Sequence, residues 1–445
     1  MALASATTIG CQAEPPPAEP LTEATDDEQP RATTYWQDVA PIYFQHCVGC
    51  HREGGMAPFV LDDYPSAAAW GRASASAVEH RVMPPWLVTD DGTCNEWKHS
   101  RSLAQAEIDT ILAWVADGTP EGQPRDDLEL PTPPRLAGAT AFRTPEFTPE
   151  PQGGAAAEYD EYRCFVIEPQ LERDMFITGY EVVPGNPAIV HHLLAMIIDP
   201  ELEVDEGVTN RDLMTALEQE SPDRIGWPCF GTAGEGIVTA SLPVGWAPGQ
   251  GVVEFPNDSG ALLRPGEVLV VQIHYNMHAP GVLGQSDSTA INLRLEPEVS
   301  REVLFELPDG LLHTMLDGEP HSLPPGEAEH RFTFSLPTDR YHAWLGSDRV
   351  ELWGVFPHMH NYGVGMQARV LDAEGRERSC VVDVFRWEYQ WQLYYFYERP
   401  IVLAPGDTLE VTCVYDTRGT SEPIWPGWGT HNEMCLLGLY VVAAR

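Results

Sequence analysis

The sequence contains no long hydrophobic run and few basic residues. No stretch of about 18 or more apolar residues occurs, which is the length that a membrane-spanning helix needs, so we expect no transmembrane segment. The 445 residues include 26 Lys and Arg against 67 Asp and Glu, a formal net charge of −41. This charge repels phosphate backbones and anionic lipids, which excludes nucleic acid as an expected partner.

Nine cysteines are many for a reducing cytosol, and they favour an exported protein. An N-terminal run of small residues ends with "TIGC" at Cys11, which resembles a bacterial lipoprotein signal without its positively charged start. Two interpretations stay open: a lipid anchor at Cys11 of a periplasmic or outer-membrane protein, or a disordered leader. In both, residues 1–32 form a leader and an acidic, Pro-rich tether.

Residues 33–122 show the period of short helices. Apolar residues recur at helical spacing in "TYWQDVAPIYFQHC", "PSAAAWGRASASAVEHRV" and "SLAQAEIDTILAWVADG", the last opening at Ser102 and ending at Gly118. These segments predict a small all-α domain. Residues 123–158 are then rich in Pro, Thr, Glu and Gly, which is typical of a linker.

The helical period disappears after residue 158. Short runs rich in Val, Ile, Phe, Tyr and Trp alternate with Pro-Gly and Asp-Gly turns, a pattern typical of antiparallel β-sandwiches. More residues follow this pattern than one sandwich needs, and "RLEPEVSREV" interrupts it near residue 297. We therefore expect two antiparallel β-sandwich (jelly-roll) domains, 159–297 and 298–445.

The pentapeptide "CVGCH" places Cys47, Cys50 and His51 directly after the first expected helix. This spacing lets both thiols bond to the vinyl groups of one haem while the histidine ligates its iron. A redox dithiol and half of a zinc site are the alternatives. An exported chain with a helical frame around the motif favours a covalent haem c.

The helical domain resembles the class I c-type cytochromes, in which a methionine in a later loop is the second axial ligand. The resemblance implies Met83, in "RVMPPW", as that ligand. Met56 is too near His51 in sequence to wrap round the ring easily. A ligand at His80 or His99 would instead give a haem held by two histidines.

The β region contains four motifs with metal-binding side chains, in the order HH, Q-x-H-Y, H-x-H and E-M-C. An adjacent pair of side chains diverges in a regular strand, so the HH pair can bind one metal only at a bulge or a strand end. Side chains at i and i+2, as in the H-x-H motif, point to the same side of a strand. The residues are His191 and His192, then His274, then His358 and His360, and finally Met434.

This ordered series resembles the copper type II, ascorbate-dependent monooxygenases, the family of peptidylglycine α-hydroxylating monooxygenase and dopamine β-monooxygenase. The resemblance implies that the first three histidines bind an electron-transfer copper. It implies that His358, His360 and Met434 bind a second, catalytic copper, where oxygen and substrate react. Imidazoles suit both copper oxidation states, and a thioether favours Cu(I), the state that binds oxygen.

The resemblance also implies a disulfide between Cys413 and Cys435, next to the methionine. The family partner of Cys164 is absent from this chain, and Cys229 is the replacement that we expect. Cys94 and Cys380 have no expected partner.

Substrate recognition differs from that of the peptide-amidating family members. Those members anchor the peptide carboxylate with an arginine before the H-x-H and a tyrosine after the methionine. This chain has Phe356 and Gly438 at these positions, and Leu436 where those members carry an asparagine. We therefore do not expect a peptide that ends in glycine, and the apolar surroundings favour an aromatic or aliphatic compound.

The resemblance implies an enzyme, a haem- and copper-containing monooxygenase that hydroxylates a C–H bond of a small organic substrate with O2. We expect the haem domain to receive electrons from a redox partner and to relay them to the copper sites, replacing or supplementing ascorbate as the external reductant. One alternative is a copper-binding electron-transfer or metal-handling protein without hydroxylase activity. Another is a cytochrome joined to sugar- or cell-surface-binding sandwiches without copper.

Overall fold

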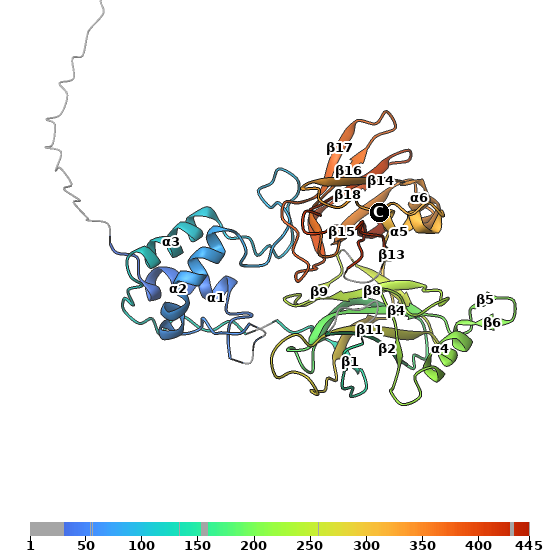
Figure 1. The fold of residues 1–445 in the computed structure, drawn as a ribbon, viewed down its shortest axis with the longest axis horizontal. Coiled ribbons are helices and arrows are strands. Elements are labelled where there is room, and N and C mark those ends of the chain that lie inside the picture. The colour runs from blue at the N-terminus through green and yellow to red at the C-terminus, as the bar shows by residue number, and fades with distance from the viewer. Residues whose placement is uncertain are drawn as a thin grey trace, which may run out of the picture.

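The structure is a computed structural model, and it describes residues 31–53, 55, 57–132, 134–152, 159–256, 258–427 and 431–444. Cys11 and Met56 lie outside the described residues, and with them the expected lipid anchor and one alternative haem ligand. Figure 1 shows a small helical unit beside two layered β units.

A π-helical turn and three α-helices make up the helical unit: η1 (Tyr35–Val39), α1 (Ala40–His46), α2 (Tyr64–Glu79) and α3 (Gln105–Ala116). Asp63 caps α2 by accepting a hydrogen bond from the Ser66 N–H at 2.7 Å. At the start of α3, the Glu107 carboxylate accepts from the Ala104 N–H at 2.8 Å. The three expected helical segments are confirmed. The third helix is shorter than the expected stretch from Ser102 to Gly118, because the cap at Ala104 starts α3 at Gln105.

The first β-sandwich packs a sheet of order β7-β2-β11-β4-β8 against β1-β12-β3-β10, with β9 paired to β3. The hairpin of β5 and β6 and the helix α4 extend from this sandwich. The bounds are β1 (Ala139–Arg143), β2 (Asp160–Ile167), β3 (Met175–Val183), β4 (Val190–Ile198), β5 (Glu203–Asp205), β6 (Val208–Thr209), α4 (Asn210–Gln219), β7 (Trp227–Pro228), β8 (Ser241–Trp246), β9 (Val253–Glu254), β10 (Ser259–Leu263), β11 (Val268–Asn276) and β12 (Ala290–Glu296).

The second β-sandwich packs a sheet of order β14-β19-β16-β17 against β13-β20-β15-β18. The parallel pairing of β10 with β13 joins the sheets of the two sandwiches into one nine-stranded sheet. The mostly β architecture expected after residue 158 is therefore confirmed. The bounds are β13 (Arg301–Glu306), α5 (Gly310–Leu316), β14 (His330–Pro337), α6 (Asp339–Leu345), β15 (Val350–His358), β16 (Gly363–Leu371), β17 (Glu377–Val384), β18 (Tyr395–Leu403), β19 (Thr408–Tyr415) and β20 (Leu436–Ala443).

The stretch 123–158, expected to be a linker throughout, also contributes a strand to the first sandwich. Ala139–Arg143 forms β1, which pairs with β12 over five residues on each strand. Phe147 is 5% exposed and belongs to the core of that sandwich. The linker prediction is wrong for this part of the stretch, because the apolar side chains within it are buried against the sheet.

The segment between α2 and α3 docks the helical unit onto the second sandwich. We call residues 86–98 the docking segment. Trp86, Val88 and Trp97 are buried in the core of the second sandwich. The backbone N–H groups of Thr89 and Lys98 each donate a hydrogen bond of 2.8 Å to a carbonyl of that sandwich. The helical unit is therefore attached by packing as well as by the Pro-rich linker.

Three disulfides link the six described cysteines outside the "CVGCH" motif. The Cys413–Cys435 and Cys164–Cys229 bonds are confirmed. The third bond joins Cys94 of the docking segment to Cys380 of β17, the two cysteines without an expected partner.

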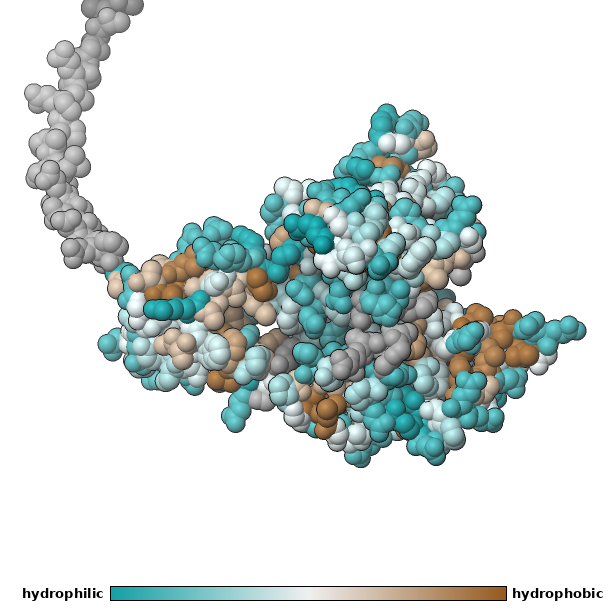
Figure 2. Space-filling model, in the orientation of Figure 1, coloured by the Kyte–Doolittle hydropathy of each residue, from teal (hydrophilic) through white to brown (hydrophobic). Residues whose placement is uncertain are grey.

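None of the helices in the described ranges is long and apolar enough to cross a bilayer. Figure 2 shows a mostly hydrophilic face, with a hydrophobic patch over β5, β6 and α4.

Candidate metal centres

The first candidate centre lies where β4 and β11 are paired. His274 of β11 is opposite His192 of β4, but the next residue of β11, Tyr275, is opposite Val190. His191 is therefore the extra residue of a β-bulge. The bulge turns both members of the adjacent pair toward the same point, as the sequence required for binding to one metal.

The three imidazoles of this centre converge through their Nδ1 atoms. His191 Nδ1 lies 3.2 Å from His192 Nδ1 and 3.1 Å from His274 Nδ1, and the other pair is 3.3 Å apart. A point equidistant from three atoms about 3.2 Å apart lies about 1.9 Å from each, close to an imidazole–metal bond length of about 2.0 Å. The geometry fits a metal ion bound by three nitrogen atoms. Within the described residues, this is the only group of three or more His, Cys, Asp or Glu side chains that gathers this closely.

Neighbouring side chains favour one tautomer for two of these rings. His191 Nε2 donates to Gln390 Oε1 at 2.9 Å, and His274 Nε2 lies 3.4 Å from Asp160 Oδ1. A proton on Nε2 leaves Nδ1 with its lone pair free, and such outer partners fix ligand tautomers in metal sites.

Burial makes the neutral form of all three rings the stable one. It lowers the pKa of His191, and it lowers the pKa values of His192 and His274 well below the usual range. Three neutral imidazoles direct three nitrogen lone pairs to one point. The lone pairs repel one another when the point is empty, and a cation placed there attracts all three. Neutral imidazole is also the form that binds metals.

The second candidate centre lies where β15 ends and β20 begins. His358 is the last residue of β15, and antiparallel pairing places it opposite Leu436. This register brings Met434, which is 3% exposed, next to the end of β15. His360 follows after the strand has ended, so the H-x-H motif spans a strand end. The rings of His358 and His360 have centroids 5.2 Å apart and are perpendicular at 89°.

The histidines of the second centre direct Nε2 toward the metal position, whereas those of the first centre direct Nδ1. His358 Nδ1 donates to Gln392 Oε1 at 2.9 Å, and His360 Nδ1 donates to the Asn432 carbonyl at 3.1 Å. Each therefore offers Nε2 to a metal. Burial lowers the pKa of His358 to about 4, so this ring is neutral at pH 7.

A buried carboxyl group holds the two loops of the second centre together. Glu433 accepts hydrogen bonds from the backbone N–H groups of His360 at 2.9 Å, Tyr362 at 2.7 Å and Met434 at 3.1 Å. Burial raises the pKa of this carboxyl to about 8. Glu433 thereby positions the strand end that carries His360 relative to the loop that carries Met434.

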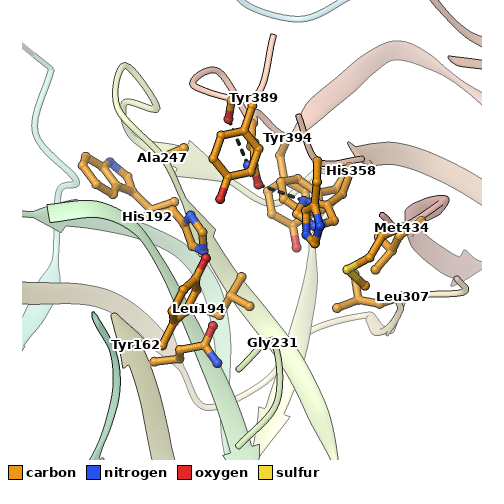
Figure 3. Close-up of a pocket in the computed structure, with 16 residues that line it drawn as sticks. Tyr162, His192, Leu194, Gly231, Ala247, Leu307, His358, Tyr389, Tyr394 and Met434 are labelled. Carbon is orange, nitrogen blue, oxygen red and sulfur yellow. Dashed lines mark hydrogen bonds between the residues drawn. The ribbon is translucent and has the colours of Figure 1, made fainter. Parts of the chain in front are cut away.

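Both centres face one cavity of about 60 Å³. Figure 3 shows His192 and Tyr162 on one side of it and His358 and Met434 on the other, with Tyr389 between them. Apolar and aromatic side chains dominate the walls, and none of the lining residues is Asp, Glu, Lys or Arg. The lining comprises Tyr162, His192, Leu194, Gly231, Trp246, Ala247, Gln272, Leu307, Phe356, His358, His360, Tyr389, Gln392, Tyr394, Met434 and Leu436.

The "CVGCH" residues lie at the end of α1 in the helical unit. Cys47 and Cys50 are free thiols, unlike the six paired cysteines. Burial raises the pKa of Cys47 to about 12 and also raises that of Cys50, which disfavours a redox dithiol, because that chemistry needs an accessible thiolate. No zinc-like cluster gathers round them in the described part of the chain. His51 Nδ1 donates to the Phe59 carbonyl at 3.1 Å, which leaves Nε2 to ligate an iron.

A second cavity, of about 480 Å³, opens beside Met83. Its walls combine apolar side chains, among them Val78, Leu103 and Ile108, with charged ones that include Asp90 and Asp91. Cys47, Cys50 and His51 do not line this cavity, so only its apolar part, beside the Met83 thioether, suits the edge of a haem. His80 and His99 are exposed on the surface. Their exposure favours Met83 over either histidine as the second ligand of a haem.

Sequence reasoning missed the residues that orient the ligands. Gln390 and Gln392 lie in the loop between β17 and β18, in the stretch "EYQWQLY", which follows neither a helical nor a strand period. Tyr389 in the same loop stacks on His191 with ring centroids 5.5 Å apart. Only Glu433 carried a signal in the sequence, as the first residue of the E-M-C motif.

Comparison with known proteins agrees with this arrangement. The sequence model of "Copper type II ascorbate-dependent monooxygenase, C-terminal domain" matches residues 309–442. Tyramine beta-hydroxylase of Caenorhabditis briggsae is 25% identical over 279 residues, 59% of this chain and 41% of the relative. Dopamine beta-hydroxylase of Homo sapiens is 24% identical over 62% of this chain and 42% of the relative. DBH-like monooxygenase protein 2 of Mus musculus is 23% identical over 62% and 42%.

The chain thus spans about two fifths of the length of these curated relatives. The matched family domain contains the H-x-H and E-M-C motifs of the second centre. These matches show that residues 309–442 correspond to the C-terminal domain of the copper type II ascorbate-dependent monooxygenases, and that a larger part of the chain is similar to copper monooxygenases.

Proposed function

We propose that the protein is a haem- and copper-containing monooxygenase that inserts one atom of O2 into a C–H bond of a small organic substrate. The reaction consumes two electrons and two protons, and the second oxygen atom leaves as water. The observation that carries the proposal is the convergence of two sets of metal-binding side chains on one cavity. Copper held by these residues supplies one-electron redox chemistry and oxygen activation.

The chain's own residues prepare the two sites for this chemistry. Gln390 keeps a proton on Nε2 of His191, and Asp160 lies beside Nε2 of His274. These two rings, with His192, offer Nδ1 to an electron-transfer copper. Gln392 keeps the proton on Nδ1 of His358 at the second site. His358, His360 and Met434 hold the catalytic copper there, and the thioether of Met434 favours Cu(I).

The helical unit fits a covalent haem c as the source of electrons. Cys47 and Cys50 provide two free thiols for the vinyl groups, His51 provides one axial ligand, and Met83 provides the other from the wall of its cavity. A haem accepts and donates one electron at a time, which matches single-copper sites. We propose that it relays electrons to the copper held by His191, with ascorbate or a redox partner protein as the donor to the haem.

The walls of the shared cavity favour an uncharged aromatic or aliphatic substrate. Phe356 and Leu436, two of the three positions at which this chain departs from the peptide-amidating members, both line the cavity beside His358 and Met434. The curated relatives are named for tyramine and dopamine, but no carboxylate lines this cavity to pair with an ammonium group.

The cellular setting follows from the redox chemistry of the cysteines. Three disulfides form readily in an oxidising compartment, which supports export. We propose a periplasmic or outer-membrane location in a bacterium, with Cys11 as the lipid anchor in the second case.

The test is aerobic incubation with ¹⁸O2 and a library of neutral aromatic and aliphatic compounds, followed by mass spectrometry. One product should gain a single ¹⁸O atom, and the gain should disappear in Met434→Ala. Oxygen consumption without any labelled organic product would instead support a copper-binding electron-transfer or metal-handling protein.

A further inference from the structure

One loop of the second sandwich touches both candidate copper centres and the first sandwich. The loop Trp387–Tyr394 joins β17 to β18, and we call it the relay loop. Four of its hydrogen bonds reach these three places: Trp387 Nε1–H to the His360 carbonyl at 3.0 Å, His191 Nε2–H to Gln390 Oε1 at 2.9 Å, His358 Nδ1–H to Gln392 Oε1 at 2.9 Å, and Tyr394 N–H to Gln250 Oε1 at 3.2 Å.

The helical unit reaches toward this loop through Arg101. This residue lies just before α3, and its guanidinium donates a hydrogen bond to the Gly249 carbonyl of the first sandwich. The same guanidinium is near enough to Cys50 to interact with it electrostatically. Arg101 therefore links the helical unit, which carries the "CVGCH" motif, to the turn that contains Gly249.

Gly249 is the point at which Arg101 and the relay loop meet. A side-chain carbon placed on Gly249 would lie 2.9 Å from Arg101 Nη1 and 3.8 Å from Trp391 Cζ3. The residue has φ +86°, a conformation that favours glycine. Glycine here lets the guanidinium and the indole ring approach the same patch of backbone.

We propose that Arg101, Gly249, Trp391 and Gln390 form the route by which single electrons pass from a haem bound at Cys50 to a copper bound at His191. The inference rests on the proposed function and adds the path to it. In each transfer the ferrous iron loses one electron and Cu(II) gains it to become Cu(I), and no proton or bond changes place. Ascorbate or a redox protein then returns the ferric iron to the ferrous state.

The contacts along this route are short and largely bonded. Electron tunnelling weakens steeply with distance and crosses covalent and hydrogen bonds more readily than empty space. The route consists of the Arg101–Gly249 hydrogen bond, the packing of Trp391 near Gly249, the covalent link from Trp391 to Gln390, and the hydrogen bond to His191. The docking segment, in contrast, enters the core of the second sandwich around Tyr395 and Tyr397, and within the described residues its ring contacts reach no further.

The test measures electron transfer without turnover. Holoprotein with ferric haem and Cu(II) is kept free of oxygen and substrate, and a flash-activated photoreductant reduces the haem. The absorption bands of the haem report its reoxidation. Electron paramagnetic resonance reports the loss of the Cu(II) signal. Trp391→Leu and Gln390→Leu should each slow the transfer at least tenfold. Gln390→Glu, which keeps an acceptor oxygen at the same position, should restore most of the rate.

The control is Trp344→Leu, the same change at a residue of α6 that is 58% exposed and far from the route along the fold. It should transfer electrons at the wild-type rate. Copper content and the reduction potentials of haem and copper are measured in every variant, so that a lost metal or a changed driving force is separated from a lost path. Transfer at the wild-type rate in Trp391→Leu and Gln390→Leu would overturn the route while leaving the relay intact. Absence of transfer in the wild-type protein would overturn both.

Discussion

The ring of Tyr389 lies over the ring of His191, with centroids 5.5 Å apart and planes inclined at 24°, although the two residues belong to different sandwiches. The same tyrosine has its ring centroid 6.1 Å from that of His360. One residue of the relay loop therefore faces candidate ligands of both metal centres. The two centres are neighbours across a shared cavity. The effect of a substitution at one centre can therefore be measured against the copper content of the other centre in the same sample.

Removing the thioether separates the roles of the two centres. Met434→Ala should retain copper at the three-histidine site and abolish hydroxylation, because only the second centre loses a ligand. Copper analysis and product formation on the same sample measure the two effects. Turnover above about a tenth of wild type, a barrier change of only about 1.4 kcal/mol, would place the methionine away from the reacting copper.

Glu433→Gln should weaken copper binding at the second centre. The amide has one acceptor oxygen in place of two, so it cannot accept all three backbone hydrogen bonds that position His360, Tyr362 and Met434. We expect a loss of about 10- to 100-fold in copper affinity, as for other outer partners of metal ligands. Isothermal titration with Cu(I) measures it, and Glu374→Gln, on an exposed turn, is the matched control. Equal affinity in both variants would show that Glu433 does not organise this centre.

Breaking the Cys94–Cys380 disulfide should loosen the docking segment. The bond closes a separation of 286 residues, and its loss in Cys94→Ser should destabilise the protein by about 2–4 kcal/mol. Hydrogen exchange at the Thr89 and Lys98 amides should quicken, because these groups bond to the second sandwich. Cys229→Ser breaks a disulfide within the first sandwich and should leave this exchange unchanged. Unaltered protection in Cys94→Ser would mean that packing alone holds the segment.

Asp309 should make the second sandwich less stable as pH rises. Its Oδ1 accepts from the backbone N–H groups of Leu312 at 2.8 Å and Cys435 at 3.2 Å, and burial raises its pKa to about 6. The raised pKa means that the folded state holds the proton more tightly than the unfolded state, whose pKa is about 3.9.

The stabilisation is therefore complete below about pH 4 and is lost as pH rises through about 6. Asp309→Asn keeps the cap and removes this loss, which we expect to be on the order of 1–3 kcal/mol between pH 4 and pH 7. Denaturant unfolding of both proteins across this range measures it. Parallel stability profiles for the two proteins would contradict the raised pKa.

The sequence predicted the elements that have a period or a local motif. The three helical segments, the two runs of strands and the Cys413–Cys435 pair each follow from apolar spacing or from a motif with a known resemblance. The bulge at His191 is one of the two arrangements, a bulge or a strand end, that strand geometry allowed for an adjacent pair facing one metal.

The rest depends on contacts between distant segments, for which one sequence carries no signal. Gln390 and Gln392 become partners of His191 and His358 only when the two sandwiches meet. The Cys94–Cys380 bond depends on how the docking segment packs, and β1 was obscured by the prolines around it. Sequence periodicity therefore located the strands that carry the ligands, while tertiary packing supplied the groups that orient them.

The metal content of the intact protein tests the central claim most directly. Plasma emission spectrometry on protein reconstituted with copper and haem gives copper and iron per chain in one measurement. The proposed centres at His191, His192 and His274, at His358, His360 and Met434, and at Cys47, Cys50 and His51 predict two copper ions and one iron. One copper ion or none per haem iron would contradict the account.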